Sequence, residues 1–500
     1  MESLNAGGLR PSVGLEIHAR LVTRRKLFCG CPSVADAVDN SAICPVCMGL
    51  PGTLPVFNEE VLGPAVRLGL ALGCAIQPVS RFDRKHYFYP DLPRNFQITQ
   101  LERPLGLGGL FAIPRGDGKG ELRVRIRRIH LEEDAGRLAA GPVPEMVGVD
   151  LNRAGAPLVE IVTEPDLDDG AAARAWVLRL RQLMVHLGVC DGAFESGSLR
   201  CDANVGFVAC DGRGGGVGAG AWTELKNLNS PGAIQRAVDH EIARLSRRIG
   251  SLDAMRRETR AWDAAAARTV LLRVKEGSPD YRYFREPDLP DVVLQQAWIE
   301  DQAARLPESP LDRERCWRER WGLAAADAAA LGREPAVADY FEAVASALAG
   351  EPGGVGSPAQ AARLAARWVL TEILAIWQGV GIDPDPCPVP AGKLASLLGL
   401  LAAERISGKA AKGVLEALRA DPEADPPALV RDLGLEMIVD PDRIRTWCRE
   451  VIAAHPAEAA SLASGKTGLL EFLAGGVLAK SEGRASPPLV KNILRALISR

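Results

Sequence analysis

The stretch Val13-Gly14-Leu15-Glu16-Ile17-His18-Ala19-Arg20-Leu21 decides how the first part of this chain folds. Apolar and polar side chains alternate along it, and this period of two predicts a half-buried β-strand. On the polar face, Glu16, His18 and Arg20 follow one another at roughly 7 Å. An imidazole beside a carboxylate can bind a divalent metal, and a neighbouring guanidinium can hold a phosphate. A merely solvated polar face is the alternative for this strand taken alone.

Other segments repeat this two-faced pattern. Leu199–Val208 alternates, with Arg200, Asp202 and Asn204 on one face. A basic alternating strand leads into His130-Leu131-Glu132-Glu133-Asp134, and such acids favour a hard cation such as magnesium, although acidic triplets are also common solvated turns. Glu160 lies inside an apolar strand, where a buried carboxylate needs a metal, a cation or a proton; a structural salt bridge is the alternative.

If these polar faces line one sheet, they form a cradle of carboxylates and cations. Carboxylates can hold magnesium, magnesium can hold ATP phosphates, and Arg or Lys offsets the charge of a transferred phosphoryl group. Lys226 belongs to a further polar set at a strand end, after a glycine-rich segment at 212–220 that we expect to be a flexible turn. No Walker loop is needed for such a site, and no nucleophile–base pair is evident.

Four cysteines form the clearest metal signal. Twelve residues separate Cys29 and Cys31 from the pair Cys44 and Cys47. Two short cysteine pairs joined by a loop can supply four thiolates to a tetrahedral zinc, and the flanking Gly and Pro residues suit tight turns. All four positions are then filled by protein, which predicts a structural zinc.

Two segments combine aromatic and basic residues, at 83–94 and at 273–290. Aromatic rings interleaved with cations can stack on bases and hold phosphates, but a buried aromatic turn with a basic flank explains the first segment equally well.

Composition limits the class of protein. The 500 residues carry 47% hydrophobic and 25% charged residues and a formal net charge of −3, so any contact with nucleic acid must come from local basic patches. No apolar run reaches the ~18 residues of a membrane span, and no secretory signal is visible. The eleven cysteines are an odd number, unlike a secreted disulfide framework, and we expect a cytoplasmic protein.

The composition changes near residue 295, where Ala-, Leu-, Arg- and Glu-rich helical patterns replace strand patterns. We therefore expect an α+β protein: an antiparallel-sheet cradle domain with a glutamine-synthetase-like ATP site and a zinc knuckle over residues 1–294, a helical domain over 295–405, and a small helical tail over 406–500. Lysines are spread along the tail.

Ordered motifs along the chain resemble the B-subunit family of the bacterial and organellar aspartyl/glutamyl-tRNA amidotransferases. They are Val-Gly-Leu-Glu-Ile-His at 13–18, Cys-Pro-Val-Cys-Met-Gly-Leu-Pro-Gly at 44–52, Tyr-Phe-Tyr-Pro-Asp-Leu-Pro at 87–93, His-Leu-Glu-Glu-Asp-Ala-Gly at 130–136, Leu-Asn-Arg-Ala-Gly-Ala-Pro-Leu-Val-Glu-Ile-Val-Thr-Glu-Pro-Asp at 151–166, Leu-Arg-Cys-Asp-Ala-Asn-Val at 199–205, Glu-Leu-Lys-Asn-Leu-Asn-Ser at 224–230 and Asp-Tyr-Arg-Tyr-Phe at 280–284. The resemblance runs over essentially the whole chain.

The resemblance implies an ATP-dependent ligase that works in a heterotrimer. Such a protein phosphorylates the side-chain carboxyl of Glu on tRNA(Gln), or of Asp on tRNA(Asn), and ammonia then displaces phosphate to give the amide. Ammonia comes from glutamine, which is hydrolysed by a separate amidase (glutaminase) protein, and a third, small protein connects the two. Tail lysines would contact the tRNA backbone rather than its bases.

The resemblance also implies site residues. Glu16, His18 and Glu133 match positions linked to magnesium, and Glu160 is added as a further catalytic candidate. Nucleotide- and substrate-binding candidates are Arg153, Arg200, Asp202, Asn204 and Lys226. Two other functions remain open: a stand-alone ATP-dependent ligase that amidates a small molecule, and a catalytically inert, zinc-bearing tRNA-binding module.

Overall fold

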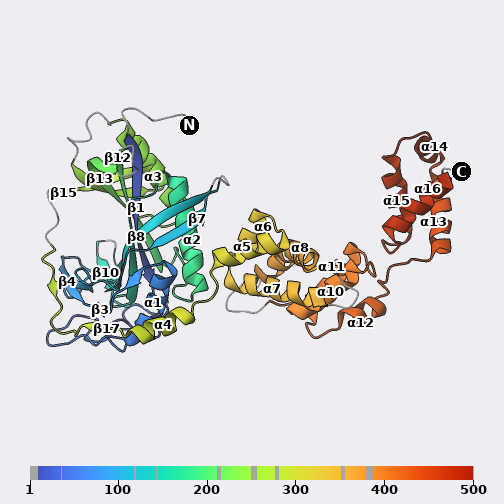
Figure 1. Ribbon diagram of the computed structural model, residues 1–500. Helices are drawn as coiled ribbons and strands as arrows, with labels where there is room; N and C mark the ends of the chain where they lie inside the picture. The colour runs from blue at the N-terminus through green and yellow to red at the C-terminus, as the bar shows by residue number, and fades with distance from the viewer. Residues whose placement is uncertain are drawn as a thin grey trace. The chain divides into compact units, whose positions relative to one another are not determined.

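The protein, seen here as a computed structural model, divides into two compact units, Met1–Ser309 and Pro310–Arg500 (Figure 1). The first is built around a sheet and the second is helical, so the predicted α+β class is confirmed. The structure describes residues 9–34, 37–116, 120–141, 143, 145–210, 216–248, 256–275, 281–350, 355–378 and 387–498.

A ten-stranded sheet organises the first unit. All of its pairings are antiparallel except the one between β13 and β14. In order across the sheet, its strands are β15 (Arg268–Lys275), β14 (Arg257–Asp263), β13 (Gly216–Lys226), β12 (Leu199–Cys210), β1 (Leu9–Arg20), β11 (Pro157–Thr163), β8 (Glu121–Glu133), β6 (Gly106–Leu107) and β2 (Ala75–Ile76), with β7 (Leu110–Pro114) paired to β8.

The predicted first strand lies at the centre of this sheet as β1. Val13, Leu15 and Ile17 are at most 1% exposed, whereas Glu16 and His18 are half-buried. The alternation read from the sequence is therefore the one observed. The glycine-rich segment was predicted wrongly in part, because residues 216–220 belong to β13; residues 211–215 lie outside the described residues.

Helices α2 (Gly170–His186) and α3 (Pro231–Ser246) lie against the sheet, α3 on β12 and β15 (Figure 1). Each begins at a capping side chain, since Asp169 accepts a hydrogen bond from the Ala172 amide and Ser230 one from the Ala233 amide. Trp176 of α2 is fully buried and packs edge-on against Phe111.

Smaller elements complete the first unit. They are η1 (Glu59–Val61), α1 (Leu62–Ala71), α4 (Gln296–Ala304), the three-stranded sheet of β16 (Phe284–Arg285), β4 (Asp83–His86) and β5 (Phe96–Thr99), the pair of β10 (Val147–Asp150) and β9 (Arg137–Ala140), and the pair of β17 (Val292–Val293) and β3 (Val79–Ser80).

The second unit contains two hydrophobic clusters, one drawn from Trp317–Val430 and one from Ile444–Leu494. The first cluster extends past residue 405, where the sequence predicts a domain boundary. The helices around these clusters are α5 (Pro310–Trp321), α6 (Ala325–Leu331), α7 (Pro335–Gly350), α8 (Pro358–Trp368), the π-helix η3 (Val369–Ile373), α9 (Leu374–Gln378), α10 (Ala391–Ala402), α11 (Gly408–Ala420), α12 (Pro426–Asp432), α13 (Pro441–Ala454), α14 (Pro456–Ala463), α15 (Leu469–Lys480) and α16 (Pro487–Ile498).

Among the described residues, every helix is too short or too polar to cross a membrane.

Candidate functional site

Strand register gathers the charged side chains of four strands on one face of the sheet. Glu16 of β1 lies opposite Asp202 of β12, and His18 lies opposite Glu160 of β11. Glu160 in turn lies opposite His130 of β8. Residues directly opposite one another in an antiparallel pair point to the same side. The polar faces predicted from separate segments therefore form one surface.

One cluster on this face pairs two histidines with two carboxylates. His18 Nε2 lies 3.5 Å from Glu132 Oε1 and 3.4 Å from Glu160 Oε2, and His130 Nε2 lies 3.2 Å from the same Glu160 oxygen. Burial alone would lower the pKa of His18, but the charges of Glu160 and Glu132 outweigh it and raise the pKa to about 9. Burial opposes ionisation of Glu160, yet the two histidines hold its pKa well below the usual range. The same charges that favour a proton on His18 would also favour a cation, and His18, Glu132 and Glu160 lie close enough together to hold a metal ion.

A second cluster consists of three carboxylates, from Glu16, Asp202 and Glu224, with one oxygen of each lying within 4.8 Å of the others. Lys226 Nζ donates to Asp202 Oδ2 at 2.7 Å and lies 3.1 Å from Glu224 Oε1, and Asn204 donates to Glu16 Oε1 at 2.9 Å. Burial, followed by the negative charge of Glu160, raises the pKa of Glu16. Three acids with one lysine leave a net negative charge that a cation would offset.

The second cluster, together with His18, His130 and Glu160 of the first, lines one cavity of about 340 Å³, whose wall also includes Lys85 and Arg273. A second hollow of about 540 Å³ shares Asp202 and Lys226 with it. The second hollow is lined by Arg200 and Arg153.

These two arginines are held by one buried carboxylate. Arg200 Nη2 donates to Asp134 Oδ1 at 2.8 Å, and Arg153 Nε lies 3.3 Å from Asp134 Oδ2. Burial acts to lower the pKa of Arg200, but Asp134 outweighs it and raises the pKa. Asp134 therefore fixes two cations at the edge of the second hollow.

The structure places Glu133 apart from the other predicted magnesium ligands. Successive side chains of β8 point to opposite faces, so Glu132 joins His18 while Glu133 faces the other way. Glu133 accepts hydrogen bonds from Arg94 and, at 3.0 Å, from the Ile98 amide. Burial raises the pKa of Glu133 although Arg94 opposes this effect.

Sequence reasoning did not single out His130, Glu132 and Glu224 as site residues. His130 and Glu132 could have been identified from the sequence, because a single strand, β8, runs from Glu121 to Glu133. His130 and Glu132 then share a face that Glu133 does not. Glu224 was visible only as one member of a polar set, and its role follows from its register opposite Asn204.

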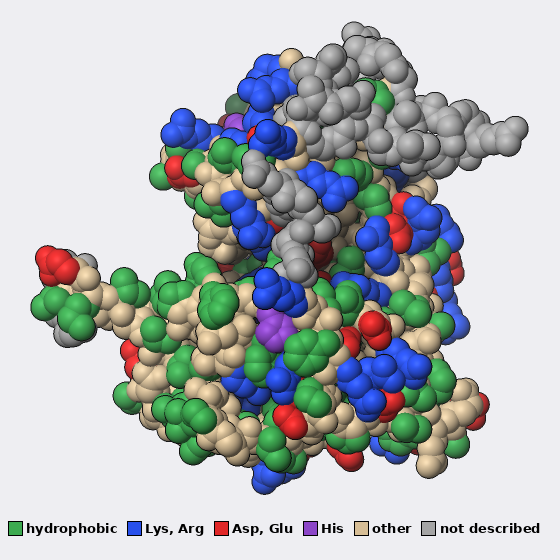
Figure 2. All heavy atoms as spheres, turned by 90° about the vertical axis from the view of Figure 1, so that its left-hand side faces the viewer, with side chains coloured by type: hydrophobic (Ala, Val, Ile, Leu, Met, Phe, Trp, Pro, Cys, Tyr) green, Lys and Arg blue, Asp and Glu red, His purple; other side chains and the backbone are tan. Residues whose placement is uncertain are grey.

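The two aromatic-basic segments, far apart in sequence, meet in the small sheet, where β4 pairs with β16. Lys85 Nζ lies 5.2 Å from the centre of the Tyr281 ring and 5.9 Å from that of Tyr87. Phe88 is 86% exposed; Asp280 lies outside the described residues. On the side of the unit that carries β4 and β15, Figure 2 shows many Lys and Arg side chains with hydrophobic side chains between them.

The predicted zinc ligands also come together. The sulfur atoms of Cys29, Cys31, Cys44 and Cys47 all lie within 4.8 Å of one another. The Cys44 amide donates to Cys47 Sγ at 3.1 Å. A hydrogen bond from Cys29 and the nearby charge of Lys26 lower the pKa of Cys47 to about 4. Four thiol groups at this spacing, with amide donors to sulfur, fit a tetrahedral metal centre such as zinc.

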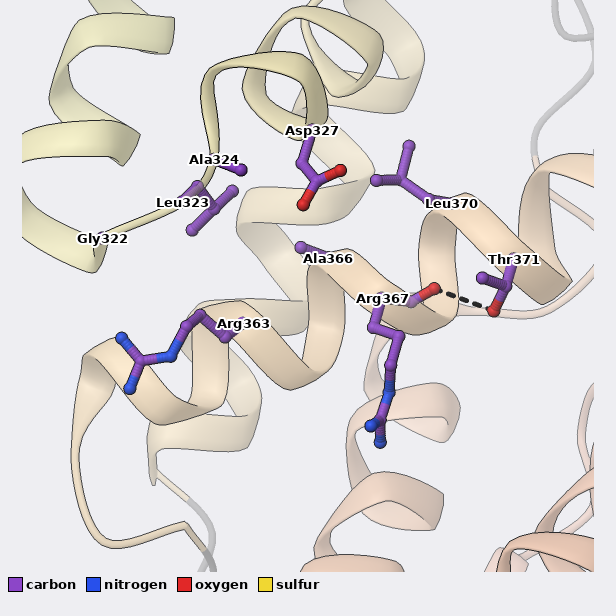
Figure 3. A pocket seen from close by; sticks show the side chains of 9 residues that line it. All are labelled: Gly322, Leu323, Ala324, Asp327, Arg363, Ala366, Arg367, Leu370 and Thr371. Atoms are coloured by element: carbon purple, nitrogen blue, oxygen red, sulfur yellow. Dashed lines mark hydrogen bonds between the residues drawn. The ribbon is translucent and has the colours of Figure 1, made fainter.

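The helical unit has a pocket of its own, of about 470 Å³. Figure 3 shows Asp327 of α6 near Leu370 on one side, with Arg363 and Arg367 of α8 extending away on the other. Arg363 Nη1 donates to the Trp321 carbonyl at 3.1 Å. Within the described residues, acid clusters able to hold a metal occur in the first unit and not around this pocket.

Comparison with known proteins also assigns the catalytic part to the first unit. Residues 11–300 match the GatB/GatE catalytic domain family, and residues 354–498 match the GatB domain family. The chain belongs to the GatB family. The family predicted from the sequence motifs is thus confirmed, and the catalytic-domain match spans both acidic clusters and the four cysteines.

Relatives within the GatB family are similar over nearly their whole length. A protein of Thermosynechococcus vestitus is 44% identical over 490 residues, covering 96% of this chain and 95% of its own. A protein of Geobacter sulfurreducens is 41% identical over 485 residues, covering 96% and 98%. Both are named as the B subunit of an aspartyl/glutamyl-tRNA(Asn/Gln) amidotransferase.

Proposed function

We propose that this chain is the component of a tRNA-dependent amidotransferase that activates the amino acid for amidation. Using ATP, it phosphorylates the side-chain carboxyl of Glu on tRNA(Gln) or of Asp on tRNA(Asn), and ammonia then displaces phosphate. The observation that carries this proposal is the convergence of two acidic clusters and their cations on one cavity. The family membership and the names of the relatives support it.

The carboxylates of Glu16, Asp202 and Glu224 suit magnesium, which prefers oxygen ligands. The raised pKa of Glu16, caused by burial and then by Glu160, fits a site in which a cation offsets the charge. When bound there, magnesium would hold the phosphates of ATP and offset their charge. Lys226 bridges two of these acids and supplies a further cation toward the phosphates.

The cluster of two histidines and two carboxylates can position an anionic group. Protonated His18 supplies a positive charge beside the carboxylates of Glu16, Asp202 and Glu224. Glu160 contacts both His18 and His130 and so orients the two imidazoles. We assign Glu160 as a positioning residue for His18, and Asn204 as one for Glu16. Arg153 and Arg200 suit binding of an aminoacylated RNA end in the adjoining hollow. Glu133 is reassigned to support of the fold through Arg94.

The four cysteines form a closed set of ligands, so we propose a structural zinc that stabilises the cradle and takes no part in the reaction. The ten cysteines whose side chains the structure describes form no disulfide, which fits the reducing cytoplasm.

We further propose that the chain assembles with an amidase (glutaminase) protein and a third, small protein into a heterotrimer. The amidase releases ammonia from glutamine. We retain cradle, helical and tail domains over residues 1–294, 295–405 and 406–500 as proposals, with tail lysines contacting the tRNA backbone.

The test is ADP release by the purified complex, with and without mischarged Glu-tRNA(Gln) or Asp-tRNA(Asn). We expect ADP formation only with charged tRNA, at least about 100-fold slower in Glu16→Gln, and unchanged in Glu319→Gln, a variant of an exposed acid in α5. ADP formation without tRNA would favour the small-molecule ligase. Normal amidated product from Glu16→Gln would favour the inert tRNA-binding module.

A further inference from the structure

Lys26 is a charged side chain sealed inside the first unit. Its exposed fraction is 0%, and it is one of the largest fully buried side chains described. An ammonium group withdrawn from water loses its hydration, and this loss must be offset by an anion or by several hydrogen-bond acceptors. The partners of Lys26 therefore indicate what the surrounding site has to supply.

Two partners lie within reach of the ammonium group. Lys26 Nζ is 3.6 Å from Cys47 Sγ and 3.3 Å from the Leu151 carbonyl oxygen. Within the described part of the chain, no carboxylate forms an ion pair with Lys26, although ion pairs are frequent elsewhere in this unit. One carbonyl does not balance a full positive charge. Of the two groups that contact the ammonium, only the Cys47 sulfur can carry the balancing negative charge.

We propose that Lys26 is the counter-cation of the metal–thiolate centre formed by Cys29, Cys31, Cys44 and Cys47. This proposal rests on the structural zinc of the proposed function. A divalent ion with four thiolates carries a net charge of −2, and Lys26 reduces it to −1 while donating a hydrogen bond to the Cys47 sulfur. Lys26 is a positioning residue, since it acts on a ligand and does not itself bind the metal.

The same lysine connects the metal centre to the segment before β11. The Leu27 amide donates to the Gly155 carbonyl at 2.8 Å, next to the bond from Lys26 to Leu151. Gly155 has φ +82°, and a Cβ there would lie 3.6 Å from both Cys47 Cβ and Lys26 Cδ. This segment carries Arg153, which lines the second hollow. Lys26 therefore couples the metal centre to the position of a substrate-binding candidate.

The first experiment measures metal binding in the full-length chain. Zinc transfer to a coloured chelator is timed for the native protein, Lys26→Met and the exposed-lysine control Lys412→Met. We expect release from Lys26→Met to be roughly 10- to 100-fold faster, and release from Lys412→Met to be unchanged. With cobalt in place of zinc, loss of the hydrogen bond to sulfur should shift the thiolate-to-metal absorption band of Lys26→Met to longer wavelength at equal occupancy. A role in packing alone would not move that band.

The second experiment covers the case in which Lys26→Met folds poorly. In a Cys44→Ser/Cys47→Ser background, which offers no thiolate partner at these positions, the lysine charge is unbalanced. In this background, Lys26→Met should raise the melting temperature or leave it unchanged. In the native background, the same substitution should lower the melting temperature. A lower melting temperature in both backgrounds would show a packing role and overturn the proposal.

The outcomes distinguish failure of the zinc assignment from failure of the role of Lys26. Absence of zinc from the native protein, together with no uptake of cobalt, would overturn the metal assignment and the role of Lys26 with it. Zinc in the native protein, with unchanged release and an unchanged cobalt band in Lys26→Met, would overturn the role of Lys26 alone.

Discussion

The sheet unit and the helical unit differ in how many charged side chains they bury. The sheet unit buries His130, Glu132, Glu160 and Lys26, whereas the described part of the helical unit buries only two charged side chains, Arg313 and Glu314. Burying a charge costs free energy unless partners compensate. The sheet unit therefore carries a larger free-energy cost of charge burial than the helical unit. His130, Glu132 and Glu160, which contribute to that cost, belong to the candidate site.

Apart from the buried Arg313, which pairs with Asp339 and Glu342, the described ion pairs of the helical unit lie at the surface. Lys480 Nζ lies 2.6 Å from Glu450 Oε2, and Lys491 Nζ lies 2.6 Å from Glu471 Oε1, with all four side chains partly in solvent. Its stability comes from two apolar clusters. The comparison teaches that substitutions of charged residues should affect the two units very differently.

The largest contrast should come from two neighbouring acids of the sheet unit. We expect Glu132→Gln to slow ADP formation roughly 100-fold, because Glu132 helps to hold protonated His18. Glu133→Gln should instead lower the melting temperature, because Arg94 loses its buried partner, and should change ADP formation less than about tenfold. ADP assays and thermal melts of both variants measure this. Equal catalytic losses would contradict the assignment of the two faces of β8.

The next effect concerns the metal centre. Cys44→Ser should remove zinc and lower the melting temperature of the sheet unit by about 5–10 °C, because a structural metal contributes directly to folding. Metal analysis and thermal melts measure this. The control is Cys316→Ser, in α5 of the helical unit, which should retain zinc. Unchanged metal content and melting temperature in Cys44→Ser would refute the zinc assignment.

A smaller effect should appear with pH. The pKa of His18 is raised to about 9 in the folded protein, because Glu160 and Glu132 outweigh burial. Its stabilising contribution is therefore complete below the unfolded value of about 6.5 and is lost as the pH rises through about 9.

The urea midpoint of the sheet unit should fall between about pH 6.5 and about pH 9.5, and more steeply in the native protein than in His18→Gln. In the control His455→Gln, in the helical unit, the urea midpoint of the sheet unit should fall with pH as steeply as in the native protein. Parallel slopes in the native protein and His18→Gln would show that the histidine is not held protonated by its neighbours.

The smallest effect should come from the surface of the helical unit. Lys480→Ala should change the free energy of unfolding by less than about 1 kcal/mol, because exposed ion pairs contribute little. It should weaken tRNA binding similarly for all sequences and reduce the salt dependence, as expected for loss of one phosphate contact. Binding titrations at several salt concentrations measure this, and unaltered binding would exclude Lys480 from the tRNA surface.

Much of the site was predictable because short segments carry it. The alternation around Glu16 and His18 placed both on one face of a strand, and the spacing of the four cysteines identified the cluster that the structure assembles. Glu133 shows the limit of such reasoning. An acidic triplet does not say which of its members lies beside His18, since a shift of one residue along a strand moves a side chain to the other face.

The sequence alone determined the family, the two-faced strands and the change from strand to helix patterns, because these depend on local order and period. Only the tertiary structure decided that Glu16, Asp202 and Glu224 converge, since strand order and register bring together residues separated by long stretches of chain. It also decided that Lys26, which looks like a surface lysine in the sequence, is buried beside Cys47. Burial and pairing are properties of the packed chain, and no local pattern encodes them.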